Sequence, residues 1–342
     1  MILKRFEALQ SFLATPRKIV VVGHRNPDGD AMGSTLALSH YLKKKNHTVH
    51  VVVPNEYPSF LHWLPGSKRT YRFDMQNSQS QRVIRESEII FLLDFNALHR
   101  VGSDMQNTLK AYPNDFVLVD HHQQPDEFKY MYSDPSMCST CEMVYHFIDK
   151  LGDTKLIDRD IATCLYTGIM TDTGSFRFRS TTSATHRIIA NLIDKGAEND
   201  RIHSNVYDSN SYGRLQLLGQ SLNNLKALPQ YNTAYITLSE DEKSAFNFEK
   251  GDTEGVVNYA LSLSDVSLAA IFIEDREQQI IKISFRSKGS FSVNQFARDH
   301  FDGGGHDNAA GGRSELSLIK TVEKFVDLLP KYQQEIVQSY EK

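Results

Sequence analysis

Three short apolar runs in the first 120 residues each end in acidic or histidine side chains. Val20–Val22 leads into His24 and a Pro-Asp-Gly-Asp turn, Ile89–Leu93 leads into Asp94, and Phe116–Val119 leads into Asp120-His121-His122. Runs of this kind, followed by loops and helical stretches, are typical of buried parallel strands. Because the carboxyl ends of parallel strands meet at one edge of an open sheet, we expect these side chains to converge on one site.

The loop after the first run and one later segment add further acidic groups. His24, Asp28 and Asp30 share the loop, where the Pro27-Asp28-Gly29 turn lets both carboxylates face the same space. Asp172 stands in Thr171-Asp172-Thr173-Gly174-Ser175, at the end of a helical pattern. Ionised carboxylates and imidazoles are groups that bind divalent cations. The candidates outnumber the ligands that one ion can use, so the sequence predicts two metal ions.

Each of these residues also has a simpler interpretation. An aspartate after a strand, such as Asp94, is most often the N-cap of the next helix. Asp28 and Asp30 are ordinary turn residues when taken alone, and a pair of histidines in a loop is usually solvated. Four separate segments that all end in potential ligands are hard to explain by turn chemistry, and this conjunction favours a metal site.

Composition is that of an ordinary soluble protein of about two domains. The chain has 342 residues, of which 40% are hydrophobic and 23% charged. Its formal net charge of −4 argues against broad binding to long duplex nucleic acid, which needs many cationic contacts to phosphates. No run approaches the roughly 20 apolar residues of a membrane span. We expect a cytoplasmic protein that does not bind membranes.

The three cysteines do not suggest a disulfide scaffold. Cys138 and Cys141 have the CxxC spacing of some zinc and redox sites, but no second such pair is present. The segment Ser139–Leu151 instead has the pattern of an amphipathic helix, with Ser139 or Thr140 as its N-cap.

The pattern along the chain predicts an α/β fold in two domains. An N-terminal domain over residues 1–205, with a mainly parallel sheet flanked by helices, is followed by a connector helix within residues 206–229 and by a smaller C-terminal α/β domain over residues 230–342. The connector pattern covers Ser211–Leu228, with leucines on one face. Strands are expected near Thr233–Leu238, Val266–Ile273 and Ile280–Arg286.

The C-terminal domain has a candidate substrate-binding segment. Gly303, Gly304 and Gly305 precede His306, and successive glycines let backbone amides approach an anion closely. Taken alone, a triple glycine is more often a flexible loop. The small residues Ala309–Gly312 are expected to pack at a helix start, and Arg286, at the end of a predicted strand, has a fork of donors suited to phosphate.

Together these motifs resemble the DHH phosphoesterases, a family named for the motif that stands here as Asp120-His121-His122. His24-xxx-Asp28-x-Asp30 resembles the first family motif, Asp94 the second and Thr171–Ser175 the fourth. The segment from Gly303 to Gly311 is similar to the substrate-binding signature of the family's associated C-terminal domain. The resemblance covers nearly the whole chain and is strongest to the bacterial type that hydrolyses very short RNA (nanoRNA) and adenosine 3′,5′-bisphosphate (pAp).

The resemblance implies roles for the matching positions. One metal would be held by His24, Asp28 and Asp94, and a second by Asp30, Asp94, His121 and Asp172. His122 would lie beside the metals, in contact with the scissile phosphate or a ligand, and Asp120 would orient a ligating imidazole. Arg100 and Asn294 also fall where the family contacts substrate or orders the site.

The implied activity is two-metal phosphoester hydrolysis, in which two cations activate a water and neutralise charge on the phosphoryl oxygens. The family favours Mn²⁺, with Co²⁺ or Mg²⁺ as alternatives. Alternatives to nanoRNA or pAp are linear or cyclic dinucleotides such as pApA and c-di-AMP, pyrophosphate, and nucleotide binding without catalysis. The sequence does not decide the oligomeric state, and a homodimer is among the alternatives.

Overall fold

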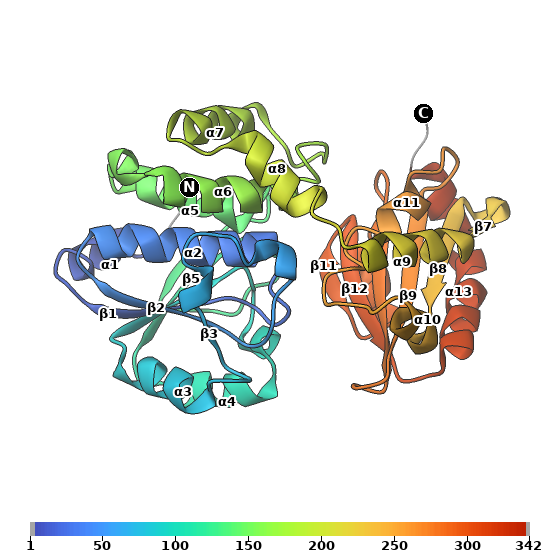
Figure 1. Cartoon of the computed structure of the whole chain (residues 1–342), viewed down its shortest axis with the longest axis horizontal. Coiled ribbons are helices and arrows are strands. Elements are labelled where there is room, and N and C mark those ends of the chain that lie inside the picture. The colour runs from blue at the N-terminus through green and yellow to red at the C-terminus, as the bar shows by residue number, and fades with distance from the viewer. Residues whose placement is uncertain (1–3, 340–342) are drawn as a thin grey trace. The chain divides into compact units, whose positions relative to one another are not determined.

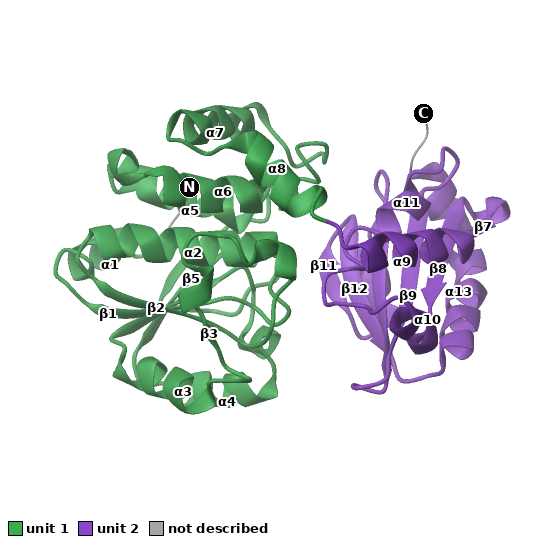
Figure 2. Ribbon diagram, viewed as in Figure 1, with its two compact units in different colours: residues 1–209 green, residues 210–342 purple. Residues whose placement is uncertain are grey.

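The computed structural model describes residues 4–339, which form two compact units that divide between Ser209 and Asn210 (Figure 2). In unit 1, six strands form a parallel sheet in the order β3-β2-β1-β4-β5-β6. Their bounds are β1 Lys18–Val22, β2 Thr48–Val53, β3 Tyr71–Arg72, β4 Ile89–Leu93, β5 Asp115–Asp120 and β6 Tyr130–Ser133. The predicted mainly parallel sheet is confirmed.

Helices cover both faces of this sheet (Figure 1). One side carries α1 Phe6–Phe12, α2 Gly29–Lys44, α5 Thr140–Lys150 and α6 Arg159–Asp172, with α7 Ser183–Asp194 and α8 Asn199–Tyr207 packed beyond them. The other side carries α3 Asn77–Glu86 and α4 Ser103–Lys110. Successive residues of β1 therefore enter different cores, Ile19 and Val21 on the α2 side, Val20 and Val22 on the α3 side. This two-sided burial explains the uninterrupted apolar runs.

Unit 2 contains a mixed sheet in the order β11-β12-β10-β9-β8-β7. Its strands are β7 Lys226–Leu228, β8 Thr233–Leu238, β9 Leu268–Asp275, β10 Ile280–Ser287, β11 Gly304–His306 and β12 Ala309–Ser314. Its helices are α9 Tyr212–Asn223, α10 Glu240–Ala245, α11 Val257–Leu261, α12 Val293–His300 and α13 Leu318–Gln338. One core packs the sheet against α12 and α13, and a second packs it against α9 and α11. The expected second α/β domain is confirmed.

Two local expectations differ from this structure. The helix expected over Ser211–Leu228 ends at Asn223, because Lys226–Leu228 pairs with β8 as an antiparallel edge strand. The helix start expected at Ala309–Gly312 was wrong, since these residues form β12 between β10 and β11. A Cβ at Gly303 would lie 2.0 Å from the carbonyl oxygen of Gly311. Glycine is therefore required here for the close packing of this hairpin, whether or not it also contacts a ligand.

Two further findings concern the described residues as a whole. None of the helices within residues 4–339 is long and apolar enough to cross a lipid bilayer. Cys138, Cys141 and Cys164 are buried free thiols.

Candidate metal centre

The strand order places the candidate ligands at one point of the unit 1 sheet. The order reverses between β1 and β4, which are hydrogen-bonded neighbours. His24 follows β1, Asp94 follows β4 directly, and Asp120 is the last residue of β5. Ligands of open α/β sheets bind beyond the carboxyl ends of the strands at such a switch point. The topology alone therefore brings three distant segments together.

The first turn of α2 supplies two more carboxylates. Asp28 is the N-cap and its Oδ1 accepts hydrogen bonds from the amides of Asp30 and Ala31, both at 3.0 Å. Asp30 is buried, and its two oxygens accept the backbone amides of Thr140 at 2.6 Å and Cys141 at 2.9 Å. These amides open α5, whose N-terminal end stabilises a negative charge.

Close packing of α6 on α2 completes the floor of the site. A Cβ at Gly168 would lie 2.2 Å from Cys141 Sγ and 2.8 Å from Asp30 Oδ1, so only glycine permits this approach. The same helix ends at Asp172, whose Oδ2 lies 3.5 Å from His121 Nε2. The close packing of α6 thus brings Asp172 to the ligands that follow β1, β4 and β5.

Asp94 lies at the centre of the group. Its Oδ2 is 3.4 Å from His24 Nε2 and its Oδ1 is 3.5 Å from His121 Nε2, so one carboxylate faces both imidazoles. The backbone of Asp94 has φ of 66°, a left-handed conformation that costs about 1 kcal/mol or more outside glycine. The sharp turn directs the side chain across the end of the sheet.

Three sets of donor atoms share Asp94. Two of them match the predicted ligands, His24, Asp28 and Asp94 in one and Asp30, Asp94 and His121 in the other, and the third is Asp94, Asp120 and His122. The donor atoms of each set lie within 4.8 Å of one another. The individual separations run from 3.4 to 3.8 Å, which is too long for good hydrogen bonds. Two ligands of one cation with bonds of about 2.1 Å lie about 3 to 4.2 Å apart. The spacing is that of donors around a cation.

Second hydrogen bonds orient both imidazoles. His24 Nδ1 lies 2.8 Å from the carbonyl oxygen of Arg25, and His121 Nδ1 lies 3.2 Å from that of Met137. A carbonyl only accepts, so each Nδ1 carries the proton and each Nε2 faces the carboxylates. A bare Nε2 lone pair beside carboxylate oxygens is repulsive, and a shared cation relieves that repulsion. The donor set therefore fits divalent metal ions.

The pKa values show how strongly the site attracts positive charge. Burial alone would lower the pKa of His24, but the carboxylates of Asp28 and Asp94 outweigh it and raise the pKa to about 10. Burial raises the pKa of Asp172 to about 6, and of the nearby charges, His121 opposes this shift whereas Asp28 and Asp94 add to it. Without metal, protons supply part of the charge that cations would bring.

His122, the last residue of the Asp-His-His motif, contacts a side chain and not a backbone carbonyl. His122 Nδ1 lies 2.7 Å from Asp120 Oδ1, a short charge-assisted hydrogen bond, whereas His121 Nδ1 faces the backbone carbonyl of Met137. Asp120 is fully buried, and its Oδ2 has no hydrogen-bond partner among residues 4–339. Asp120 therefore contacts the histidine expected beside the metals, whereas the sequence led us to expect contact with a histidine that binds one; its orienting role stays a prediction.

Thr140 also belongs to the site, although no sequence motif pointed to it. Its hydroxyl donates to Asp94 Oδ1 at 2.9 Å, and its amide donates to Asp30 Oδ2. Ser139, the residue before it, is the N-cap of α5 and accepts the amide of Glu142. The capping pattern at Ser139-Thr140 was visible in the sequence. Nothing in that pattern shows that the capped end faces two carboxylates more than 40 residues away.

The remaining predicted residue of unit 1, Arg100, lies in the short 3-10 helix Leu98–Val101. Its side chain is exposed, and its carbonyl accepts the amide of Arg25 at 2.9 Å. Arg100 thus supports the loop that follows His24 through its backbone. Its contact with substrate stays a prediction.

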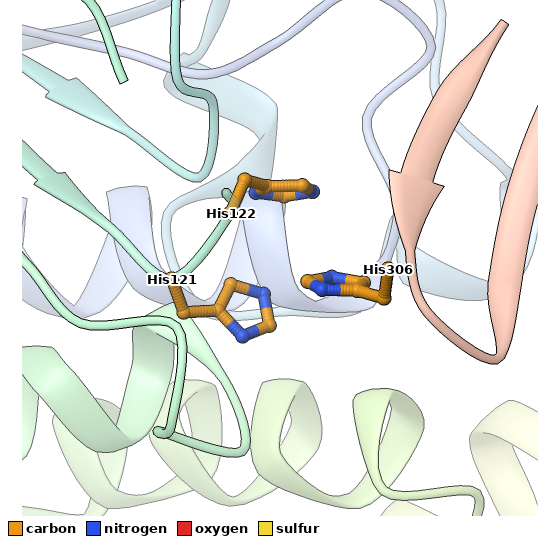
Figure 3. A group of neighbouring side chains, drawn as sticks. All are labelled: His121, His122 and His306. Carbon is orange, nitrogen blue, oxygen red and sulfur yellow. The ribbon is translucent and has the colours of Figure 1, made fainter. Parts of the chain in front are cut away.

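The other predicted substrate residues belong to unit 2. Arg286 lies in β10, opposite Ala309 of β12, and His306 ends β11 (Figure 3). Asn294 is buried in α12, and its Oδ1 accepts the amide of Gly305 at 3.1 Å. Asn294 therefore fixes the glycine-rich strand, which presents Gly303, Gly304 and Gly305 in an ordered hairpin.

Comparison with known proteins agrees with this geometry. Residues 18–169 match the DHH family, N-terminal domain, and residues 230–336 match the DHHA1 domain. The chain is 30% identical over 316 residues to the bifunctional oligoribonuclease and PAP phosphatase NrnA of Thermus thermophilus, covering 90% of this chain and 88% of that protein. It is 26% identical over 338 residues to the cyclic-di-AMP phosphodiesterase GdpP of Bacillus subtilis, covering 95% of this chain but only 49% of that protein.

A solved structure is similar over almost the full length. It is the crystal structure of an exopolyphosphatase-related protein from Bacteroides fragilis, with 38% identity, a TM-score of 0.91 and 97% of each chain covered. The similarity to this structure therefore includes both units of the present chain.

Proposed function

The chain belongs to the DHH family, and from this premise we propose that it is a metal-dependent phosphoesterase that hydrolyses very short oligoribonucleotides and pAp. The observation that carries the proposal is Asp94, whose two oxygens face His24 and His121 in two ligand sets. The end-to-end similarity to an oligoribonuclease and PAP phosphatase supports this substrate class.

We infer two cation sites from the shared carboxylate. His24, Asp28 and Asp94 would hold one cation, and Asp30, Asp94, His121 and Asp172 would hold the other. Imidazole mixed with carboxylate suits Mn²⁺, with Co²⁺ or Mg²⁺ as alternatives. Such ions, when bound, acidify water and neutralise charge on the phosphoryl oxygens.

The protein's own groups hold this arrangement and handle a proton. The Nδ1 bond to Asp120 keeps a proton on that nitrogen of His122, so Nε2 is the ring atom available to the substrate. A charged His122 would stabilise negative charge on the phosphate or donate a proton to the leaving oxygen. Asp120 would hold the His122 ring in this orientation from its buried position.

Unit 2 would select the substrate. We propose that Arg286 and His306 contact the terminal nucleotide, and that the hairpin amides of Gly304 and Gly305 approach its phosphate or base. Asn294 would act through Gly305 by holding the strand in place. Binding energy from this distal part then supports reaction at the metal centre.

A dinucleotide phosphodiesterase is the second candidate. The observation in its favour is the similarity to GdpP over 95% of this chain. GdpP is about twice as long, and the match to it is weaker in identity than the match to NrnA.

The test is an activity panel with manganese, comparing pAp, oligoribonucleotides of two to five residues, pApA and cyclic-di-AMP. We expect pAp and the shortest RNAs to be the best substrates. Preference for the dinucleotides by kcat/KM would overturn the substrate assignment. Asp94→Asn keeps the size of the side chain but removes a charge from both ligand sets, and should abolish most turnover while circular dichroism stays native.

A matched control for Asp94→Asn is Asp74→Asn, an exposed aspartate outside the site that pairs with Arg72. This variant should retain wild-type turnover. Near wild-type hydrolysis by Asp94→Asn at limiting metal would refute the proposed centre.

A further inference from the structure

A cavity of unit 1 lies at the other end of α2 from the metal centre. It has a volume of about 450 Å³ and is lined by the second half of α2, by β2, by β3 and by the segment around the short helix Ser67–Arg69. At 1.5 Å per residue, Lys43 is about 20 Å along the helix from Asp30. The cavity is therefore distinct from the site described above, although one helix contributes to both.

Three cationic side chains line this cavity, Lys43, Lys68 and Arg69, and no lining residue is acidic. Within residues 4–339 none of the three forms an ion pair or a side-chain hydrogen bond. The contrast with their neighbours is direct, because Lys44 pairs with Asp158 and Lys45 pairs with Asp153, both within 3 Å. The chain has a net charge of −4, yet no carboxylate in the described part of the chain forms an ion pair with these three cations.

The like charges affect one another. Partial burial and the charge of Arg69 lower the pKa of Lys43. Burial, and after it the charge of Lys43, lower the pKa of His50, which also lines the cavity. Cations held together at a cost in electrostatic energy are stabilised by an anion that enters between them.

Two buried hydroxyl groups belong to the same wall. Ser39 is 2% exposed, and Ser39 Oγ and Thr70 Oγ1 are buried without a hydrogen-bond partner among the described residues. Buried hydroxyls are nearly always satisfied, so each of these needs an explanation. A ligand oxygen would accept from them after a small local adjustment.

We propose that this cavity binds a small molecule that carries a phosphate group, with Lys43, Lys68 and Arg69 as the phosphate contacts. Arginine and lysine are the side chains that recognise phosphoryl oxygens. The floor is apolar, formed by Leu36, Val49 and Val51, and Tyr71 adds an aromatic face. The volume and this mixed lining suit a mononucleotide, whose base would cover the apolar part.

The only tryptophan of the chain provides a local probe. Trp63 lines an adjoining cavity that shares His40, Gly66, Lys68 and Arg69 with this one, and its one acidic lining residue is Asp160. Ligand entry beside Lys68 and Arg69 should change the fluorescence of Trp63. The metal centre contains no tryptophan, so this signal does not depend on catalysis.

The experiment is a titration of full-length protein in EDTA, excited at the tryptophan band, with AMP, inorganic pyrophosphate or sulfate at constant ionic strength. We expect a saturable change with AMP and pyrophosphate. Tighter binding of AMP would identify the nucleoside as part of the ligand, and equal binding would show that phosphate alone is recognised. An equal response to sulfate would overturn phosphate recognition.

The double variant Lys43→Ala/Arg69→Ala should weaken binding by about tenfold for each cation removed. The matched control is Lys110→Ala/Arg187→Ala, which removes an exposed lysine from the last turn of α4 and an exposed arginine from α7. It should leave the titration unchanged. Failure to see saturation by fluorescence and by calorimetry, or unaltered affinity in the Lys43 and Arg69 variant, would refute the proposal.

Discussion

Thr140→Val isolates one hydrogen bond to the shared carboxylate without altering the ligands. Valine has nearly the shape of threonine, so the change removes the 2.9 Å bond to Asp94 Oδ1 and leaves the amide bond to Asp30 in place. Asp94 is 2% exposed, so water cannot replace the lost donor. A hydrogen bond to a charged group contributes about 1.5–3 kcal/mol, which predicts a loss of about 10- to 150-fold in manganese affinity or in kcat/KM at limiting metal.

The assay is a manganese titration by calorimetry, together with hydrolysis of pAp at limiting and at saturating metal. If Thr140 acts by holding Asp94 in position, saturating metal should restore most of the pAp hydrolysis that Thr140→Val loses at limiting metal. Thr167→Val is the control, because Thr167 is equally buried but donates only to the carbonyl of Thr163. The reasoning is refuted if Thr140→Val and Thr167→Val bind manganese with the same affinity.

Three further predictions address proton release, substrate selection and helix packing. In metal-free protein the pKa of His24 is raised to about 10, so a cation that binds at pH 6–8 must displace the proton of this residue. Calorimetry should therefore show that manganese affinity rises with pH, by about tenfold per pH unit for each proton released, and an affinity that does not change with pH would contradict this. His306→Ala or Arg286→Ala should reduce kcat/KM for pAp more than for bis(p-nitrophenyl) phosphate, and equal losses would exclude a role in recognising the nucleotide. Gly168→Ala places a Cβ 2.2 Å from the sulfur of Cys141 and should lower the free energy of unfolding in urea by about 2 kcal/mol or more. Gly219→Ala, in an open part of α9, should raise it slightly, and a Gly168→Ala protein more stable than the Gly219→Ala protein would contradict the packing.

Local sequence patterns predicted the elements that carry the centre. The apolar runs before His24, Asp94 and Asp120 became β1, β4 and β5 with bounds that differ by at most one or two residues. The helical pattern that ends at Asp172 was also predicted. These elements are long or strongly apolar, so their local preferences agree with the final fold.

The pattern failed where small or short segments depend on their partners. Lys226–Leu228 looked like the end of a helix but pairs with β8, and Ala309–Gly312 looked like a helix start but pairs with β10. Three to six residues have too little periodicity to decide between helix and strand. Hydrogen bonds to the neighbouring strands stabilise these short segments as strands, whatever their local preference.

The amino-acid sequence was enough to identify the groups that can bind cations and their positions relative to the strand ends, because both properties are local. Three other features arise only when the chain folds. Asp94 presents one oxygen to each imidazole, the amides of Thr140 and Cys141 donate to Asp30, and Lys43, Lys68 and Arg69 line one cavity. These are distances between segments separated by tens of residues, and they follow from strand order and helix packing, which no single segment encodes.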